Sequence, residues 1–218
     1  MKLRGVVLDM DGTITRFNLD FREARRVALA ELEKLNLRTA DMTEQLSIYL
    51  ILKQLRGRLD IETYENLRKR FYNLLEDMEI KAAQQVMLYP GALDTLRKLQ
   101  ERCLRIGLVT NNGQKGTDLT LKRFGLKLFF DAIVTRDDCE EMKPDPAPLR
   151  KALTELKIGA DEAIFVGDGL MDMIAAKQAG LTSVAVPTGP FSVERMLQSE
   201  PDYLLASVND LPDLIVLF

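Results

Sequence analysis

The chain has 218 residues, of which 46% are hydrophobic and 29% are charged, and 30 Lys and Arg against 33 Asp and Glu give a net charge of −3. This composition is typical of a soluble globular protein, and it excludes a disordered or a fibrous chain. It lacks the basic excess of a nucleic-acid binder. The absence of histidine excludes histidine zinc sites, a Ser-His-Asp triad and a histidine general base.

The cysteines and the N-terminus bear on the cellular compartment. Cys103 and Cys139 do not form a disulfide framework, so we expect two free thiols in a reducing compartment. The apolar run near the N-terminus ends at Asp9, which is too short for a signal peptide. No stretch reaches the roughly 18 apolar residues of a membrane span. We therefore expect a cytoplasmic protein that binds neither membrane nor nucleic acid, and whether it is a monomer or a homodimer stays open.

The first predicted element is a short buried strand over residues 3–8, which ends before a Gly-Thr turn. The following segment, residues 17–86, has a single glycine and no proline, and its apolar residues recur at helical spacing. We predict three or four helices in it, with breaks near 37–41 and 57–60. This segment is expected to form a small helical domain inserted after the first strand.

Beyond the turn at Tyr89-Pro90-Gly91, short apolar strands alternate with amphipathic helices, which predicts right-handed crossovers and a mainly parallel sheet. We predict a Rossmann-like, three-layer α/β core domain of residues 1–16 and 87–218, and an all-helical cap domain of residues 17–86. Met42, Met78 and Met87 are expected to fill the core rather than to form a ligand site. The apolar tail 214–218 is expected to be the buried face of a last helix, with a dimer contact as the alternative. The predicted strands of this part are 104–109, 132–135, 163–166, 183–186 and 203–205, and the predicted helices are 92–102, 115–124, 146–157, a helix ending at Ala179, 192–198 and a last helix at the C-terminus.

Polar residues gather where the predicted strands end. Asp9 and Asp11 follow the first strand, Thr110 and Asn111 follow the second, and Asp168 follows the strand that ends at 166. In an open parallel sheet, ligands bind beyond the carboxyl ends of the strands. Three carboxylates without histidine or thiol form a hard-oxygen set that suits Mg²⁺. Carboxylates at such close quarters would repel one another unless a cation joined them.

The same region holds groups that suit an anion. Lys143 could supply a fixed positive charge, and Thr110 and the turn amides at Gly12 and near Asn111 could donate hydrogen bonds to anionic oxygens. A divalent cation, a lysine and several donors around an acidic nucleophile describe a site for phosphoryl transfer.

Four motifs in order resemble one known family. The segment Asp9-Met10-Asp11-Gly12-Thr13 resembles the DxDGT signature of the haloacid dehalogenase-like superfamily. The strand end at 108–111, Lys143 before a proline, and the acidic segment 167–172 resemble its other three motifs. The resemblance covers nearly the whole chain, and the helical insert is similar to the small cap of one large subgroup.

The resemblance implies roles for the acidic residues. Asp9 would attack phosphorus and form an aspartyl-phosphate. Asp11 would protonate the leaving oxygen and then deprotonate the attacking water. Mg²⁺ would bind the Asp9 carboxylate, the Asp11 backbone carbonyl and Asp168. Gly169 stands where the family often has a hydroxyl residue, which removes one donor near the metal.

The resemblance also implies how the phosphoryl group is held. Thr110 and the Asn111 amide would bind its oxygens, together with the amide at Gly12. Lys143 would bridge the nucleophile and the phosphoryl group, and Asp172 would orient Lys143 or lie behind the metal. Arg58, in the only glycine-containing turn of the insert, could meet an anionic group of the substrate, although a solvated loop explains it equally well.

These features predict a Mg²⁺-dependent phosphatase that acts on a small phosphorylated metabolite, and the nearest resemblance is to the phosphoglycolate phosphatase-like subgroup. The segment 14–18 after the first motif departs from the sequence that is usual in that subgroup. Within it, Arg16, Phe17 and Asn18 lie at the first connection to the insert and, like Arg58, are candidates for substrate contact. Two alternatives stay open. One is a phosphomutase that resembles β-phosphoglucomutase, and the other is a regulatory protein that binds phosphate without turnover.

Overall fold

The computed structural model describes residues 2–16 and 21–218. The chain forms two compact units, of which the first comprises Met1–Asn18 and Ala83–Phe218 and the second comprises Leu19–Ala82. Among the described residues, none of the helices has the length and apolar character needed to cross a membrane.

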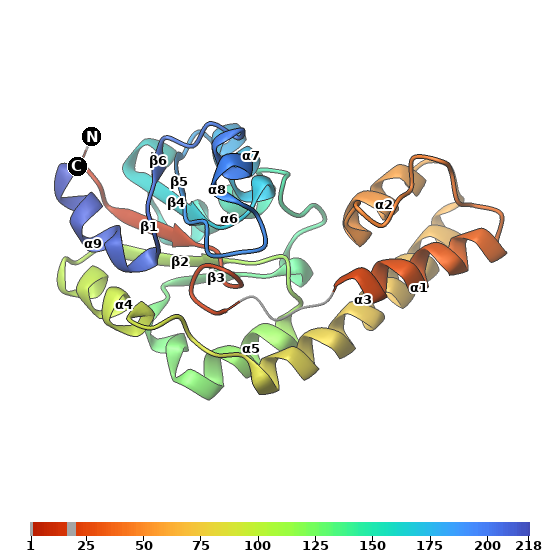
Figure 1. Cartoon of the computed structure of the whole chain (residues 1–218), viewed down its shortest axis with the longest axis horizontal. Coiled ribbons are helices and arrows are strands. Elements are labelled where there is room, and N and C mark those ends of the chain that lie inside the picture. Colours follow the sequence, from red (N-terminus) through yellow and green to blue (C-terminus); the bar gives the residue numbers. More distant parts are fainter. Residues whose placement is uncertain (1, 17–20) are drawn as a thin grey trace. The chain divides into compact units, whose positions relative to one another are not determined.

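The first unit is built on a parallel sheet (Figure 1). In the described part of the chain the sheet has six strands in the order β3-β2-β1-β4-β5-β6, and every adjacent pair is parallel. The central strands are continuous apolar runs because helices cover both of their faces. The strands are β1 (Gly5–Leu8), β2 (Arg105–Val109), β3 (Ala132–Val134), β4 (Ala163–Gly167), β5 (Thr182–Ala185) and β6 (Tyr203–Leu204).

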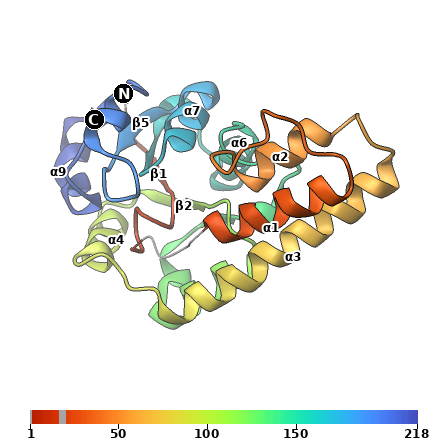
Figure 2. The same ribbon diagram turned by 45° about the vertical axis from the view of Figure 1, so that its right-hand side comes forward.

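Helices cover the sheet on two sides, which gives three layers (Figures 1 and 2). One apolar cluster joins Leu8 and Leu108 of the sheet to helices α4, α5 and α9, and another joins Val7 and Phe165 to helices α6 and α7. The Rossmann-like α/β prediction is therefore confirmed. The helices of this unit are α4 (Ala92–Glu101), α5 (Gln114–Phe124), α6 (Ala147–Leu156), α7 (Leu170–Ala179), α8 (Val193–Leu197) and α9 (Leu211–Leu214).

The register of the sheet brings the predicted site segments to one edge. Leu8, the last residue of β1, pairs with Leu108 of β2 and with Val166 of β4. The Asp9 amide continues this ladder by donating to the Val166 carbonyl at 2.9 Å. The residues that follow β1, β2 and β4 therefore emerge side by side.

The second unit is helical in its described part. It contains α1 (Phe21–Lys34), α2 (Ile48–Leu55) and most of α3 (Ile61–Gln85), whose last three residues belong to the first unit. Its apolar core contains Leu32, Leu52 and Phe71, one from each helix. That these helices act as a cap stays a prediction, as do the predicted domain boundaries.

The two connections between the units run next to each other. Thr15 pairs with Leu88 in an antiparallel bridge, and the Tyr89 amide donates to the Ile14 carbonyl at 2.9 Å. Met87, which we expected in the core, lies in this connecting segment and is 58% exposed, so that expectation is wrong.

The apolar tail is only partly buried. Leu214 and Ile215 contribute to the core, whereas Val216 and Leu217 are exposed. The expected burial of residues 214–218 is thus wrong for Val216 and Leu217, whereas Phe218 is half-buried and packs edge-on against Tyr203 of β6.

Candidate active site

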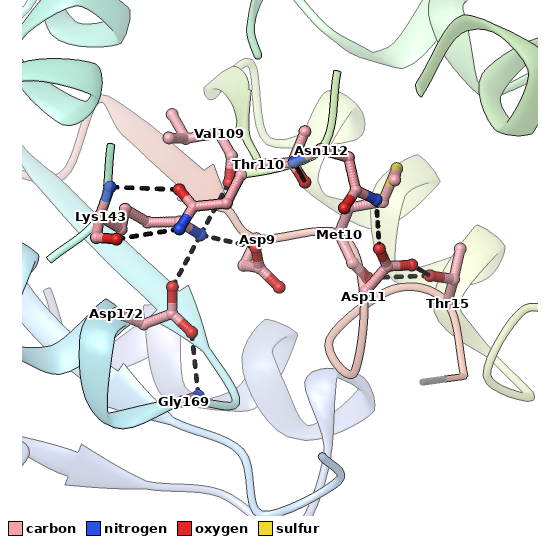
Figure 3. Close-up of polar contacts among 11 residues, drawn as sticks. Asp9, Met10, Asp11, Thr15, Val109, Thr110, Asn112, Lys143, Gly169 and Asp172 are labelled. Carbon is pink, nitrogen blue, oxygen red and sulfur yellow. Dashed lines mark hydrogen bonds and ion pairs between the residues drawn. The ribbon is translucent and has the colours of Figure 1, made fainter. Parts of the chain in front are cut away.

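A buried lysine joins two carboxylates at the carboxyl end of the sheet (Figure 3). The Lys143 Nζ lies 2.6 Å from Asp9 Oδ1 and 2.7 Å from Asp172 Oδ1, and it donates to the Val109 carbonyl at 3.0 Å. The Lys143 side chain is only 3% exposed. These contacts fix the lysine beside the end of β1, and that it also binds a phosphoryl group stays a prediction.

Asp172 is itself anchored at the start of α7. Its Oδ2 accepts a hydrogen bond from the Gly169 amide at 2.9 Å, while its Oδ1 faces Lys143. One oxygen of this carboxylate thus accepts a hydrogen bond at the N-terminus of a helix, and the other forms an ion pair with a lysine. Asp172 therefore contacts the lysine that also contacts Asp9, and its role, to orient Lys143 or to lie behind a metal, stays a prediction.

Three buried carboxylates could hold a metal ion here. Asp9, Asp168 and Asp172 each offer an oxygen, and these oxygens all lie within 4.8 Å of one another. Carboxylate oxygens are the ligands that Mg²⁺ prefers. Lys143 already contacts two of the three groups, so its single charge leaves the cluster strongly negative. The donor set and its charge fit a hard divalent cation.

Burial makes this negative charge costly. It raises the pKa of Asp9 to about 7, an effect that the charge of Lys143 opposes and that of Asp172 reinforces. Burial, with the charges of Asp9 and Asp172, also raises the pKa of Asp168 well above its ordinary value. Burial by itself would lower the pKa of Lys143. The charges of Asp172 and Asp9 outweigh this effect, so the pKa of Lys143 lies above its ordinary value. The raised pKa values of Asp9 and Asp168 mean that a nearby positive charge would favour the ionised form of both carboxylates.

Asp11 has different surroundings, although it is only two residues from Asp9. Its Oδ1 accepts from the Thr15 hydroxyl at 2.7 Å, and its Oδ2 accepts from the side-chain amide of Asn112. Figure 3 shows its carboxylate directed toward Thr15 and Asn112, away from Lys143. Our sequence reasoning missed Asn112; the signal was a second asparagine directly after Asn111.

The turn after β2 places the predicted phosphate-binding residues. Thr110 is buried, and its hydroxyl accepts a hydrogen bond from the backbone amide of Asn112 at 3.2 Å. The Asn111 side chain donates to the Lys143 carbonyl at 2.9 Å and accepts from the Lys143 amide at 3.1 Å. Asn111 therefore also fixes the backbone of the catalytic lysine candidate, a role that the sequence did not indicate. Phosphate binding by Thr110 and by the amides of Asn111 and Gly12 stays a prediction.

The other predicted substrate-contact residues belong to the insert or to its first connection. Arg58 is exposed on the turn between α2 and α3 in the second unit, and its contact with a substrate stays a prediction. Arg16 is exposed at the end of the first connection. Phe17 and Asn18 lie outside the described residues.

The fold and the cluster define an α/β protein with an aspartate–lysine site at the carboxyl end of a parallel sheet. A family model described as haloacid dehalogenase-like hydrolase matches residues 6–186. The chain therefore belongs to the haloacid dehalogenase-like hydrolases, and the predictions of this family and of a hydrolase are confirmed.

Curated relatives include several proteins named pyrophosphatase PpaX. The one from Halalkalibacterium halodurans is 37% identical over 127 residues, which are 58% of this chain and 59% of that protein. The one from Bacillus cereus is 27% identical over 215 residues, which are 97% of this chain and 95% of that protein. In the relatives from Halalkalibacterium halodurans, Bacillus velezensis and Bacillus pumilus, the match spans only 57 to 61% of the relative's length.

Solved structures show the same fold. A hydrolase from Pseudomonas syringae has a TM-score of 0.72 at 24% identity, with 99% of both chains covered. A protein from Clostridium acetobutylicum described as a predicted phosphatase has a TM-score of 0.72 at 23% identity, with 100% of both chains covered.

Proposed function

We propose that this hydrolase is a Mg²⁺-dependent phosphatase that acts on a small phosphorylated metabolite through an aspartyl-phosphate on Asp9. The observation that carries the proposal is the contrast between two neighbouring aspartates. Asp9 is buried and in contact with a lysine, whereas Asp11 is half-buried and accepts hydrogen bonds from the Thr15 hydroxyl and the Asn112 side-chain amide. Carboxylates in such different environments suit different roles, one as nucleophile and the other as acid and base.

In the first step an Asp9 carboxylate oxygen attacks phosphorus, and the bond from phosphorus to the leaving oxygen breaks. Lys143 holds Asp9 Oδ1, so Oδ2 is the oxygen left to attack. Asp11 in its protonated form gives its proton to the leaving oxygen. Because both Asp11 oxygens accept hydrogen bonds from Thr15 and Asn112, Asp11 must exchange at least one of these contacts to do so.

In the second step Asp11 takes a proton from water, and the water oxygen bonds to phosphorus as the bond from phosphorus to Asp9 breaks. Inorganic phosphate leaves, and Asp9 and Asp11 return to their starting states. Mg²⁺ bound by Asp9, Asp168 and the Asp11 carbonyl would supply positive charge that offsets the carboxylates and stabilises the phosphoryl oxygens. Thr110 and the amides of the turn after β2 would donate hydrogen bonds to those oxygens.

The test is phosphate release from a panel of small phosphate esters and inorganic pyrophosphate, with Mg²⁺ and with EDTA. The variant Asp9→Asn removes the nucleophile, and Asp94→Asn, on the exposed face of α4, is the matched control. We expect release that needs Mg²⁺, is lost in Asp9→Asn and is unchanged in Asp94→Asn. Undiminished release by Asp9→Asn, or no release by folded wild-type protein, would contradict the proposal.

The names of the relatives make pyrophosphate a specific candidate within the panel. A phosphate leaving group is a far weaker base than an alkoxide, so it needs less help from a general acid. Asp11→Asn should therefore cost more with an alkyl phosphate than with pyrophosphate. Isomerisation of a sugar phosphate that depends on a bisphosphate, in place of phosphate release, would instead support the phosphomutase.

A further inference from the structure

The loop between β5 and α8, residues 186–192, is connected to two other segments of the first unit. The Thr188 hydroxyl donates a hydrogen bond to the Gly12 carbonyl, in the turn that follows β1. The carbonyl of Thr188 accepts a hydrogen bond from the Tyr89 hydroxyl, just before α4. One residue thus links the Asp9–Asp11 turn to the segment that leads into α4.

The Asp168 carboxylate lies against the backbones of Gly12 and Gly189, next to this link. A Cβ atom built on Gly12 would overlap the Asp168 carboxylate, and a Cβ built on Gly189 would overlap the same oxygen, Oδ2. The Asp168 carboxylate therefore lies between two glycine backbones, where no side chain fits on either side. Gly12 also has φ +89°, a conformation that other residues rarely adopt. The Thr188–Gly12 hydrogen bond joins the two backbones.

The Tyr89 hydroxyl also lies within electrostatic reach of this carboxylate. Burial, and then the negative charge of Asp168, raise the pKa of Tyr89 above its ordinary value. Thr188 and Gly189 are half-buried in a loop that begins where β5 ends beside β4. Both contacts of Thr188 are therefore made by residues that lie close to the Asp168 carboxylate or next to one that does.

We propose that Thr188 and Tyr89 are positioning residues that keep the Asp168 carboxylate between Gly12 and Gly189, in the orientation in which it binds Mg²⁺. The proposal rests on the proposed function, because it takes Asp168 as a metal ligand. Without the link, the glycine-containing loop can move away and the carboxylate gains rotational freedom. Outer partners of metal ligands typically change metal affinity about 10- to 100-fold when they are removed.

The test measures Mg²⁺ binding directly, by isothermal titration calorimetry on the whole chain, with no substrate present. Thr188→Val removes the hydroxyl at nearly constant volume, and Thr188→Ser retains it. Thr154→Val is the matched control, since the Thr154 hydroxyl donates to the Arg150 carbonyl on the exposed surface of α6. Circular dichroism without Mg²⁺ establishes that each variant is folded.

We expect the dissociation constant for Mg²⁺ to rise at least about tenfold in Thr188→Val and to return close to the wild-type value in Thr188→Ser. Thr154→Val should bind as the wild type does. Tyr89→Phe should weaken binding, and the double variant Thr188→Val/Tyr89→Phe should be little worse than Thr188→Val, because both groups act on one link.

Gly189→Ala gives a second, independent arm, because its methyl group must displace either the loop or the Asp168 carboxylate. Gly189→Ala should weaken Mg²⁺ binding even though Thr188 is intact. If Thr188→Val does not fold, this variant alone tests whether the position of the Asp168 carboxylate matters for Mg²⁺ binding. Unchanged affinity in Thr188→Val and Gly189→Ala would overturn the positioning role and leave the proposed function standing. Wild-type protein that binds no Mg²⁺ would overturn both.

Discussion

Replacing Lys143 with methionine tests the charge balance of the site. The substitution keeps an unbranched side chain of similar length but removes the charge that lies 2.6 Å from Asp9 and 2.7 Å from Asp172. Removing one member of a buried ion pair typically costs about 3–5 kcal/mol, because the remaining charge is left without compensation. We expect Lys143→Met to destabilise the protein by this amount at pH 8 in EDTA.

The cost should depend on pH, because protons can replace the lost charge. The pKa of Asp9 is raised to about 7 even though Lys143 opposes the rise, so it climbs further once the lysine is gone. Below that pKa the variant takes up a proton and escapes part of the penalty. For one proton the penalty changes by up to about 1.4 kcal/mol per pH unit, so it should be clearly smaller at pH 6 than at pH 8.

The assay is urea unfolding followed by far-UV circular dichroism, since the chain has no tryptophan. Hydrogen exchange in β1 and β4 assigns the loss to the sheet-containing unit. Lys177→Met is the control, because the Lys177–Glu200 pair is exposed and such pairs contribute less than about 1 kcal/mol. The double variant Lys143→Met/Asp172→Asn should recover part of the stability. A loss for Lys143→Met no larger than that of Lys177→Met, and equal at both pH values, would refute the reasoning.

Two further expectations concern Asp9 and Asp11. Mg²⁺ must displace the proton that Asp9 holds below about pH 7, so the Mg²⁺ dissociation constant should fall as pH rises from 6 to 8; titration calorimetry showing equal affinity would contradict this. Asn112→Asp would place a carboxylate beside Asp11 in place of an amide donor, and like charges raise a pKa. The part of the pH–rate profile that reports the ionisation of Asp11 should then move to higher pH. The control variant Asp94→Asn should leave the profile unchanged.

Much of the fold follows from local patterns. The run Gly5–Leu8 is apolar at nearly every position and is buried at every position, as expected of a strand covered on both faces. The sequence changes from apolar to polar at Asp9, Thr110 and Asp168, and each of these residues directly follows a strand in the structure. A parallel sheet places these strand ends at the same edge, and the structure adds that β2 and β4 are the two neighbours of β1, which brings the three residues together.

The residues that sequence reasoning missed depend on geometry between segments. Either Asn111 or Asn112 could reach Asp11, and only the conformation of the turn directs Asn112 to Asp11 and Asn111 to Lys143. The loop of Thr188 and Gly189 could be recognised as a turn, but alternating strands and helices do not give the order of strands in the sheet. Only the pairing of β5 with β4 brings this loop to Asp168.

The charge of the cluster selects the kind of ion it can hold. If Asp9, Asp168 and Asp172 are all ionised, the single positive charge of Lys143 leaves two negative charges in a buried site. A monovalent cation would leave one of these without compensation, and a trivalent cation would leave an excess positive charge. A divalent cation balances the cluster, and it allows Asp9 to be ionised at neutral pH, which a nucleophile requires. The raised pKa values of Asp9 and Asp168 therefore describe a site in which protons and a divalent cation compete for the same oxygens.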